Sequence, residues 1–514
     1  MAFDAGDGRA AAGLRLAVLG LSGAAGALAY PGTDWWLLGW LWPVPALIAA
    51  VERPPRGALA DGWLAGTVFF LVLLRWLDHT FQHYSAIPWP VSWLPIGLLA
   101  AYCGLYVGLT AGAVAWLGTR LGEGWALALA PAIWVAGEWV RGRLMDGFPW
   151  GLLGYSQHSM LAVIQVAELA GVYGVSFLLA VVASALAGLV ALGPGRSRLG
   201  LAAAAVLLAA CLGWGTLALQ AEERRAAGVG PRVAVIQPSV EQTLKWDPAR
   251  HAEHVASYER LTRQAARAEP ALIVWPETAT TIFLRGDPGL LGRLTRLAAE
   301  ARAPLLVGSV DRREPGGRWL NSAFLLTEQG ITGRYDKIHL VPFGEYVPLS
   351  GLIGFVRSWA EFISDFDAGE RHTVFPLPGA AFGTVICYEV IFPELFRGFV
   401  RGGADFMVNI TNDAWFGRTS GPWQHLGMLP LRAVEHRVAI ARSANTGVSA
   451  FVSPTGRVTQ TLPLFERGVL AERVAPRART TLYTRYGDWL AYLSLGLTGL
   501  GLGWAVWRRS LPAC

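Results

Sequence analysis

Residues 383–389 read Gly-Thr-Val-Ile-Cys-Tyr-Glu, an apolar and β-branched run that ends in a cysteine and two polar residues. Short runs of this kind are typical of buried strands. Similar runs recur at 233–236, 271–275, 305–308, 323–326, 406–410 and 448–452, and polar helical stretches near 250–268, 288–301 and 423–436 alternate with them. This alternation predicts an α/β domain over residues 228–478, with helices covering the faces of a sheet.

The segments on both sides of this domain are more apolar. Of the 514 residues, 53% are hydrophobic and 16% are charged, against roughly a quarter charged in an average soluble domain. Runs of about 20 apolar residues can cross a bilayer, and they lie near 12–30, 35–51, 58–77, 91–118, 124–140, 172–193, 199–219 and 489–507. The sequence predicts eight transmembrane helices, seven in a membrane domain over 1–220 and one at 489–507.

Arginines at the ends of the expected spans predict the orientation, because Lys and Arg collect in cytoplasmic loops. Both termini are expected in the cytoplasm and the α/β domain on the outer side. Arg75, Arg141 and Arg143 are exceptions to the rule, because they fall on the outer side. Arg9 and Arg15, followed by an apolar run and Ala-Leu-Ala at 27–29, also fit a cleavable signal peptide. We expect the first helix to be retained, since the loop after it is very short.

The formal net charge of +6 is compatible with a nucleic-acid partner, but the arginines are scattered or lie at span ends, which favours topology signals and solvated faces. We expect no nucleic-acid partner. His251 and His254 lack a completing ligand, and the glycine-rich stretch 496–503 lies in an expected span. No metal site and no cofactor are therefore expected. A monomer is compatible with the sequence.

Cys387 is the first candidate for chemistry. A thiol between a strand end and a helix start is expected to be exposed and able to form a thiolate, whereas a buried structural cysteine is the alternative. The other cysteines are Cys103 and Cys211 in expected spans and Cys514 at the terminus. Cys387 therefore has no disulfide partner in the α/β domain, which favours the reactive interpretation.

Glu277 and Lys337 have weaker individual signals. Glu277 follows the run 271–275, where partial desolvation suits a general base, and a helix N-cap or a solvated loop acid is the alternative. Lys337 precedes an apolar stretch at 338–343 and is by itself typical of a surface charge. If a thiolate attacked a carbonyl nearby, the Lys337 ammonium would stabilise the oxyanion.

Together, Val-Trp-Pro-Glu-Thr at 274–278, Arg-Tyr-Asp-Lys-Ile at 334–338 and Val-Ile-Cys-Tyr-Glu at 385–389 resemble the Glu-Lys-Cys triad of the nitrilase, or carbon-nitrogen hydrolase, superfamily. A nitrilase domain with seven spans before it and one after resembles the apolipoprotein N-acyltransferase family over nearly the whole chain. Supporting motifs are EWVR at 138–141, GFPWG at 147–151, GVYG at 171–174, KIHLVPFGEYVP at 337–348 and NITNDAWF at 409–416.

The resemblance implies a nitrilase-like αββα sandwich on the periplasmic face of a bacterial inner membrane. It also implies a ping-pong reaction in which Glu277 deprotonates Cys387 and Lys337 polarises an acyl ester of a phospholipid. The resulting Cys387 thioester would pass its fatty acyl group to the α-amine of the diacylglyceryl-cysteine at the N-terminus of an apolipoprotein. Phospholipid, apolipoprotein and membrane lipids are the partners implied.

The resemblance further implies supporting or substrate-binding roles for Glu345, Tyr388, Glu389 and Trp246. We expect Glu345 to position Lys337 and Glu277. Between the Lys337 and Cys387 motifs, apolar residues within 352–363 fall on one helical face. This pattern fits either a lid that enters the membrane interface or an ordinary core-facing helix.

Two other functions remain open from the residues alone. A membrane-tethered amidase or nitrilase would hydrolyse a small amide with water as the acceptor. A transporter with an outward binding domain would make the triad coincidental, and its best support is two acidic residues expected to be intramembrane, Glu138 and Glu168.

Overall fold

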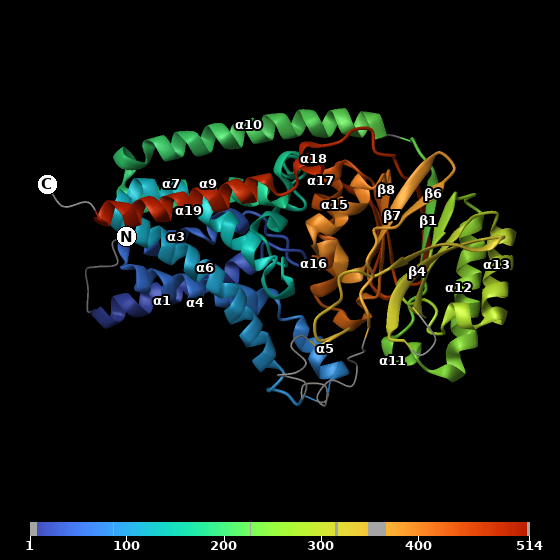
Figure 1. The fold of residues 1–514 in the computed structure, drawn as a ribbon. Helices are drawn as coiled ribbons and strands as arrows, with labels where there is room; N and C mark the ends of the chain where they lie inside the picture. Colours follow the sequence, from blue (N-terminus) through green and yellow to red (C-terminus); the bar gives the residue numbers. More distant parts are fainter. Residues whose placement is uncertain (1–7, 86, 227, 314–316, 348–365, 511–514) are drawn as a thin grey trace. The chain divides into compact units, whose positions relative to one another are not determined.

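The computed structural model describes residues 8–510 apart from 86, 227, 314–316 and 348–365, so the expected lid at 352–363 lies outside the described residues. The chain forms two compact units (Figure 1). The helical unit consists of Met1–Asp78, Pro90–Leu219 and Arg485–Cys514, and the sheet unit consists of His79–Trp89 and Gln220–Thr484.

The helical unit is built from long apolar helices with short connections. Its main helices are α1 (Gly8–Ala27), α2 (Leu38–Leu41), α3 (Val44–Glu52), α4 (Pro55–Leu73), α6 (Trp93–Leu121), α7 (Glu123–Arg141), α8 (Leu161–Ile164), α9 (Ala167–Leu192) and α19 (Trp489–Ser510). Helix α10 (Pro194–Ala226) begins in this unit, and α5 (Leu77–Tyr84) and α18 (Leu482–Tyr486) lie where the chain passes between units.

Six helices in the described part of the chain are long and apolar enough to cross a membrane, so the expectation of eight spans is not confirmed. They are Arg9–Ala27, Pro55–Leu73, Trp93–Leu121, Ala167–Leu192, Pro194–Ala226 and Trp489–Trp507. The run expected at 35–51 instead forms two short helices that are interrupted at Trp42 and Pro43, because proline lacks the N–H that a continuous helix needs. The run at 124–140 lies in α7, which is helical but less apolar, since it carries Glu138 and Arg141.

Glu138 and Arg141 have structural contacts within the helical unit. Glu138 Oε1 accepts hydrogen bonds from the backbone N–H of Leu153 at 2.6 Å and the indole of Trp134 at 3.1 Å. Arg141 donates to the carbonyls of Phe148 and Trp150 at 2.6 and 2.7 Å. The two side chains thus hold the non-helical loop after α7, whose backbone groups need partners in an apolar environment.

The sheet unit contains two six-stranded sheets (Figure 1). The first has the order β12-β1-β2-β3-β4-β5, formed by β1 (Arg232–Gln237), β2 (Leu272–Val274), β3 (Leu305–Arg312), β4 (Trp319–Thr327), β5 (Gly330–Asp336) and β12 (Gly468–Arg473). The second has the order β11-β10-β9-β8-β7-β6, formed by β6 (Val374–Leu377), β7 (Ala380–Ile386), β8 (Phe406–Thr411), β9 (Ile440–Ala444), β10 (Ser449–Val452) and β11 (Val458–Leu462).

The two sheets share one plan of strand directions. Strands β1, β2 and β3 are parallel, as are β7, β8 and β9, and the flanking strands pair antiparallel. Across the interface between the sheets, the Ser443 hydroxyl donates to the carbonyl of Ile236 at 2.9 Å. This contact links β9 to β1, so the parallel strands of one sheet lie against those of the other.

Helices cover the outer faces of both sheets. Helices α12 (His251–Ala266) and α13 (Pro288–Ala301) pack on the first sheet, and α15 (Pro393–Arg401) and α17 (Leu429–His436) pack on the second (Figure 1). Apolar residues of α12, α13 and the first sheet form one buried cluster. Helix α13 begins at Asp287, whose side chain caps the Leu290 N–H, followed by Pro288 at the first helical position.

The seven strands expected from apolar runs are all present. The expected helix over 423–436 is instead two helices, α16 (Gly421–Leu426) and α17. Strands β5, β6, β9, β11 and β12 were not expected from the sequence. With these strands, the sheet unit has two six-stranded sheets. The α/β pattern alone did not reveal the second sheet.

Candidate active site

The candidate residues meet where parallel strands of both sheets end. Cys387 directly follows β7, Asn412 follows β8 and Asn445 follows β9, while Glu277 lies just after β2. Loops at the carboxyl ends of adjacent parallel strands lie side by side, and this is where α/β proteins commonly place their sites. The face-to-face contact of the sheets brings the two groups of strand ends together.

Cys387 opens a short 3-10 helix, Cys387–Ile391, and has a φ of +52°. Few non-glycine residues adopt this backbone conformation. The expectation of an exposed cysteine is wrong, because only 8% of the residue is accessible. Burial and the nearby Glu277 carboxylate raise the pKa of the Cys387 thiol, and the opposing effects of Lys337 and a hydrogen bond with Thr411 are smaller. A thiolate is therefore not stabilised in the resting protein, contrary to the sequence-based expectation.

Both carboxylate oxygens of the buried Glu277 have hydrogen-bond donors. Oε1 accepts from the Asn321 amide at 2.7 Å and lies 3.5 Å from the Lys337 ammonium. Oε2 accepts from the backbone N–H of Asn412 at 2.8 Å. These contacts orient the carboxylate and replace the water that burial removes.

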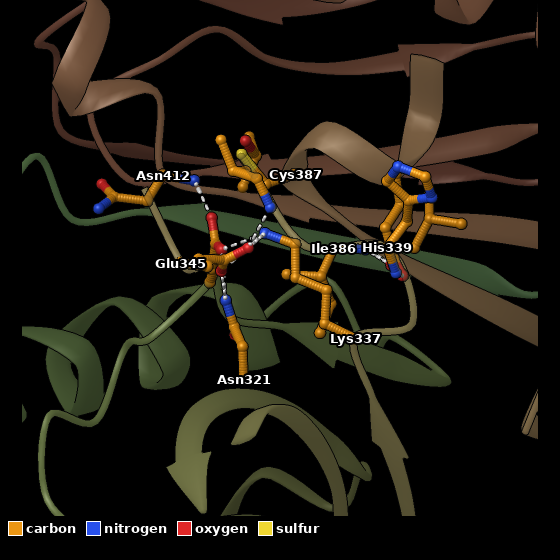
Figure 2. Close-up of polar contacts among 12 residues, drawn as sticks. Asn321, Lys337, His339, Glu345, Ile386, Cys387 and Asn412 are labelled. Atoms are coloured by element: carbon orange, nitrogen blue, oxygen red, sulfur yellow. Dashed lines mark hydrogen bonds and ion pairs between the residues drawn. The ribbon is translucent and has the colours of Figure 1, made fainter. Parts of the chain in front are cut away.

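Lys337 lies directly after β5 and is buried between two carboxylates. Its Nζ donates to Glu345 Oε1 at 2.9 Å and lies near Glu277. Burial favours loss of the proton, but the charges of Glu345 and then Glu277 outweigh it, so the pKa of Lys337 is raised. Figure 2 shows the Lys337 side chain pointing toward Glu345, with Cys387 above them in this view.

Glu345 connects several parts of the site. Its Oε1 also accepts from the Asn321 amide at 3.0 Å, and its Oε2 accepts from the Val341 backbone N–H at 2.8 Å. Asn321 therefore donates to Glu277 and Glu345 at once (Figure 2). This arrangement is compatible with the expected positioning role of Glu345.

Glu389 lies two residues after Cys387 and is fully buried. It accepts from the backbone N–H groups of Ile338, His339 and Ile386 at 2.6, 3.1 and 2.7 Å, and from the Tyr335 hydroxyl at 2.7 Å. Burial raises the pKa of Glu389 to about 7, although its hydrogen bonds oppose this rise. Glu389 thus joins the loop after Lys337 to the turn that carries Cys387.

Tyr388 and Trp246 occupy different environments. Tyr388 is largely buried, and its ring packs edge-on against Phe392 with 5.3 Å between centroids. Trp246 follows the short helix α11 (Gln242–Lys245) and is 50% exposed. Among the expected site residues, Trp246 is the one whose side chain is most available to a ligand.

A buried polar network lies behind Cys387 and was not expected from the sequence. His425 Nε2 lies 3.1 Å from the Cys387 carbonyl, and His425 Nδ1 lies 2.9 Å from Asp413 Oδ1. Arg442 donates to Asp413 at 2.5 Å and also to Asn409. Arg442 and His425 hold the pKa of Asp413 well below its usual range. This network supports the backbone of Cys387 in its uncommon conformation.

The end of α5 packs on the turn beside this network. The Thr80 hydroxyl donates to the Trp415 carbonyl at 2.9 Å, and the Tyr84 hydroxyl donates to the Ala414 carbonyl at 3.3 Å. The supported 3-10 turn, Asp413–Phe416, starts next to Asn412, which binds Glu277. The motif at 409–416 drew attention to this turn in the sequence, but it did not predict the contacts of the turn.

The site combines a carboxylate, an ammonium and a thiol with little access to water. Such a set can carry out nucleophilic acyl substitution, because the carboxylate can accept the thiol proton and the ammonium can stabilise an oxyanion. Within the residues that the structure describes, no group of three or more His, Cys, Asp or Glu side chains is arranged to hold a metal ion.

Comparison with known proteins gives matches to both parts of the chain. A model of the apolipoprotein N-acyltransferase N-terminal domain matches residues 22–185, and a carbon-nitrogen hydrolase model matches residues 232–482. A crystal structure of an amidase from Nesterenkonia sp. covers 52% of this chain and 97% of its own, with 21% identity and a TM-score of 0.39.

Similar full-length proteins include the apolipoprotein N-acyltransferases of two bacteria. The Geobacter metallireducens protein is 38% identical over 96% of this chain and 95% of its own length. The Azotobacter vinelandii protein is 38% identical over 91% of each chain. These similarities extend through the helical and the sheet units, and the chain belongs to the apolipoprotein N-acyltransferase family.

Proposed function

We propose that this protein transfers a fatty acyl group from a phospholipid to the α-amine of the N-terminal diacylglyceryl-cysteine of an apolipoprotein. The observation that carries the proposal is the burial of Glu277, Lys337 and Cys387 in one site, within a chain that is similar to apolipoprotein N-acyltransferases along nearly its whole length. Glu277 is the base, Lys337 stabilises the oxyanion and Cys387 is the nucleophile.

The first half-reaction forms a thioester. Glu277 takes the proton of the Cys387 thiol as the sulfur attacks the carbonyl carbon of a phospholipid ester, and the carbonyl electron pair moves to the oxygen. Lys337 stabilises this oxyanion. When the carbonyl re-forms, the bond to the glycerol oxygen breaks, and that oxygen takes the proton from Glu277. The products are acyl-Cys387 and a lysophospholipid.

The second half-reaction forms an amide. The neutral α-amine of the acceptor attacks the thioester carbonyl, and Glu277 accepts the N–H proton. Collapse of the tetrahedral intermediate breaks the C–S bond, and the Cys387 sulfur recovers a proton from Glu277. An α-amine has a pKa near 8, so a useful fraction is neutral at neutral pH.

The amidase alternative is less well supported. Water must be kept from the thioester for acyl transfer to succeed, and burial of Cys387 and Lys337 favours that outcome. The six long apolar helices among the described residues and the similarity to N-acyltransferases favour a lipid donor over a small soluble amide.

Four residues around the triad have supporting roles in this proposal. Glu345 positions Lys337 and, through Asn321, Glu277. Glu389 fixes the Cys387 turn against the loop after Lys337, and Tyr388 packs beside that turn. The exposed Trp246 contacts an entering substrate.

The placement in the membrane is also part of the proposal. A catalytic domain over 228–478 faces the periplasm, both termini are cytoplasmic, and the helical segments within 1–220 together with 489–507 cross the bacterial inner membrane eight times. In this arrangement, α7 is a less apolar crossing and the apolar α2–α3 segment is a short, interrupted one. Contacts with neighbouring helices can satisfy the polar groups of such segments.

A transfer assay tests this function. The full-length protein is reconstituted in vesicles that contain phospholipid with isotopically labelled acyl chains, and a diacylglyceryl-cysteinyl peptide is added. We expect the peptide to gain one labelled acyl group as an amide, detected by mass spectrometry, and a peptide with an acetylated α-amine to gain none. Release of free fatty acid at the same rate with and without peptide, and no acylated peptide, would identify a hydrolase instead.

A further inference from the structure

Lysine is rare in this chain. Only two of its 43 Lys and Arg residues are lysines, Lys245 and Lys337, and all the others are arginines. Both lysines are buried, with exposed fractions of 3% and 1%. Arginine and lysine are not interchangeable, because the lysine ammonium is compact and can lose its proton when buried. Lys337 has a role in the proposed reaction, whereas Lys245 has none so far.

Lys245 contacts the same site from the short helix after β1. It is the last residue of α11, after β1, and its Nζ donates to the backbone carbonyl of Glu277 at 3.1 Å. Gln242, three residues earlier, accepts from the Asn412 side-chain amide at 2.8 Å. Because the Asn412 N–H binds the Glu277 carboxylate, α11 supports Glu277 at its backbone and through Asn412.

The electrostatic surroundings of Lys245 include the reacting groups. Burial lowers the pKa of Lys245 to about 8, although Glu277 and Cys387 both act to raise it. On the side of α12, Lys245 in turn contributes to lowering the pKa of His254. The titratable groups that face Lys245 are therefore Glu277, Cys387 and His254.

We propose that Lys245 is a positioning residue of this site, which fixes the main chain of Glu277 and supplies positive charge to the Glu277–Cys387 pair as the thiol loses its proton. This inference rests on the proposed function and adds a second cation to it. A compact ammonium suits the contact with the Glu277 carbonyl, whereas a guanidinium group would bring five N–H donors that need acceptors.

The presence of only two lysines allows a direct test in the full-length protein. Labelling of lysine with carbon-13 at Cε gives two side-chain NMR signals, and the Lys245→Met variant identifies which one belongs to Lys245. We expect the Lys245 signal to titrate with a pKa about 8 in the wild type. In Glu277→Gln its pKa should fall further, because the carboxylate charge that raises it is gone. A Lys245 signal that titrates at the ordinary lysine value and is unchanged in Glu277→Gln would overturn the proposal.

The first half-reaction provides the second test. Thioester formation at Cys387 is followed in single-turnover experiments with phospholipid and no acceptor, so the acceptor amine does not contribute to the pH profile. Lys245 is an ammonium below a pH of about 8 and loses its charge above it. We expect the wild-type rate to decline above this pH. The Lys245→Met variant should be slower by roughly 100-fold and lack this decline, as expected for a misplaced base.

Arg250→Met is the matched control, because it removes a nearby positive charge whose side chain is 47% exposed. Its rate and pH profile should equal those of the wild type. Equal rates and profiles in Lys245→Met and the wild type would overturn the role of Lys245. A wild-type protein that forms no thioester would instead count against the proposed function, while the NMR titration would still test the coupling of Lys245 to Glu277.

Discussion

Cys387 combines a left-handed backbone conformation with a buried thiol. Uncommon backbone conformations persist when surrounding contacts hold them, and here His425 and Glu389 contact the backbone on both sides of the thiol. Because the pKa of the Cys387 thiol is raised, the proposed reaction needs Glu277 to remove the thiol proton during attack. The site therefore differs from cysteines that are held as thiolates by nearby cations.

The raised pKa predicts slow alkylation of Cys387. At neutral pH, iodoacetamide should modify Cys387 in the folded protein more slowly than in the unfolded protein, because less thiolate is present and burial limits access. The rate should rise steadily with pH. Mass spectrometry of the peptide that contains Cys387 measures both rates. Faster alkylation in the folded protein at neutral pH would indicate a resting thiolate.

The contacts of Glu345 predict a large effect of Glu345→Gln. The change removes the carboxylate charge that lies nearest to the buried Lys337 ammonium. Loss of a charged partner is strongly unfavourable for a buried ion. We expect thioester formation to slow by roughly 100-fold, since Lys337 and Glu277 lose their alignment. The control is Glu370→Gln, which breaks the exposed ion pair with Arg313 and should leave the rate unchanged. A wild-type rate in Glu345→Gln would contradict the positioning role.

At the scale of elements, the apolar strands were predictable because buried parallel strands consist of nearly continuous apolar residues. Edge strands β11 and β12 were not, since exposed and half-buried residues hide the strand pattern. The motifs around Glu277, Lys337 and Cys387 also identified residues that the fold brings together. Asn321 and Lys245 could not be identified in this way. In a sequence, a polar residue on a strand or a short helix is typical of the surface, and only the tertiary structure shows that these two are buried.

Strand β3 supports the position of Glu277, which gives a prediction for Gly308→Ala. A Cβ atom at Gly308 would lie 2.3 Å from the Pro276 carbonyl oxygen and 2.8 Å from Glu277 Cα. Backbone atoms cannot move aside easily, so Glu277 should shift and thioester formation should slow by roughly 100-fold. Gly292→Ala is the control, because the added Cβ would lie 3.7 Å from the flexible side chain of Arg296 on the same helix. Equal single-turnover rates for the two variants would contradict this account.

At the scale of the whole molecule, the chain joins an apolar helical unit to a sheet unit that contains the site. The lengths of the apolar runs predicted the six helices in the described residues that are long and apolar enough to cross a membrane. They did not reveal that one segment is broken at Trp42 and Pro43. An average hydropathy over about 20 residues does not show where the backbone leaves the helical conformation.

The proposed orientation predicts which positions react with a membrane-impermeant maleimide in spheroplasts. A cysteine introduced by Glu300→Cys in α13, at an exposed position of the sheet unit, should react in intact spheroplasts. A cysteine introduced by Arg198→Cys in α10, also at an exposed position, should react only after permeabilisation. Mass spectrometry distinguishes the introduced cysteines from the natural ones. The reverse pattern would place the sheet unit in the cytoplasm.

The most direct measurement is the mass of the Cys387 peptide after incubation with phospholipid in the absence of an acceptor amine. The account predicts that this peptide gains one fatty acyl group, that neutral hydroxylamine removes it as expected for a thioester, and that addition of a diacylglyceryl-cysteinyl peptide transfers it to the α-amine. An unmodified Cys387 under these conditions, or acyl transfer that continues in Cys387→Ala, would contradict the thioester route.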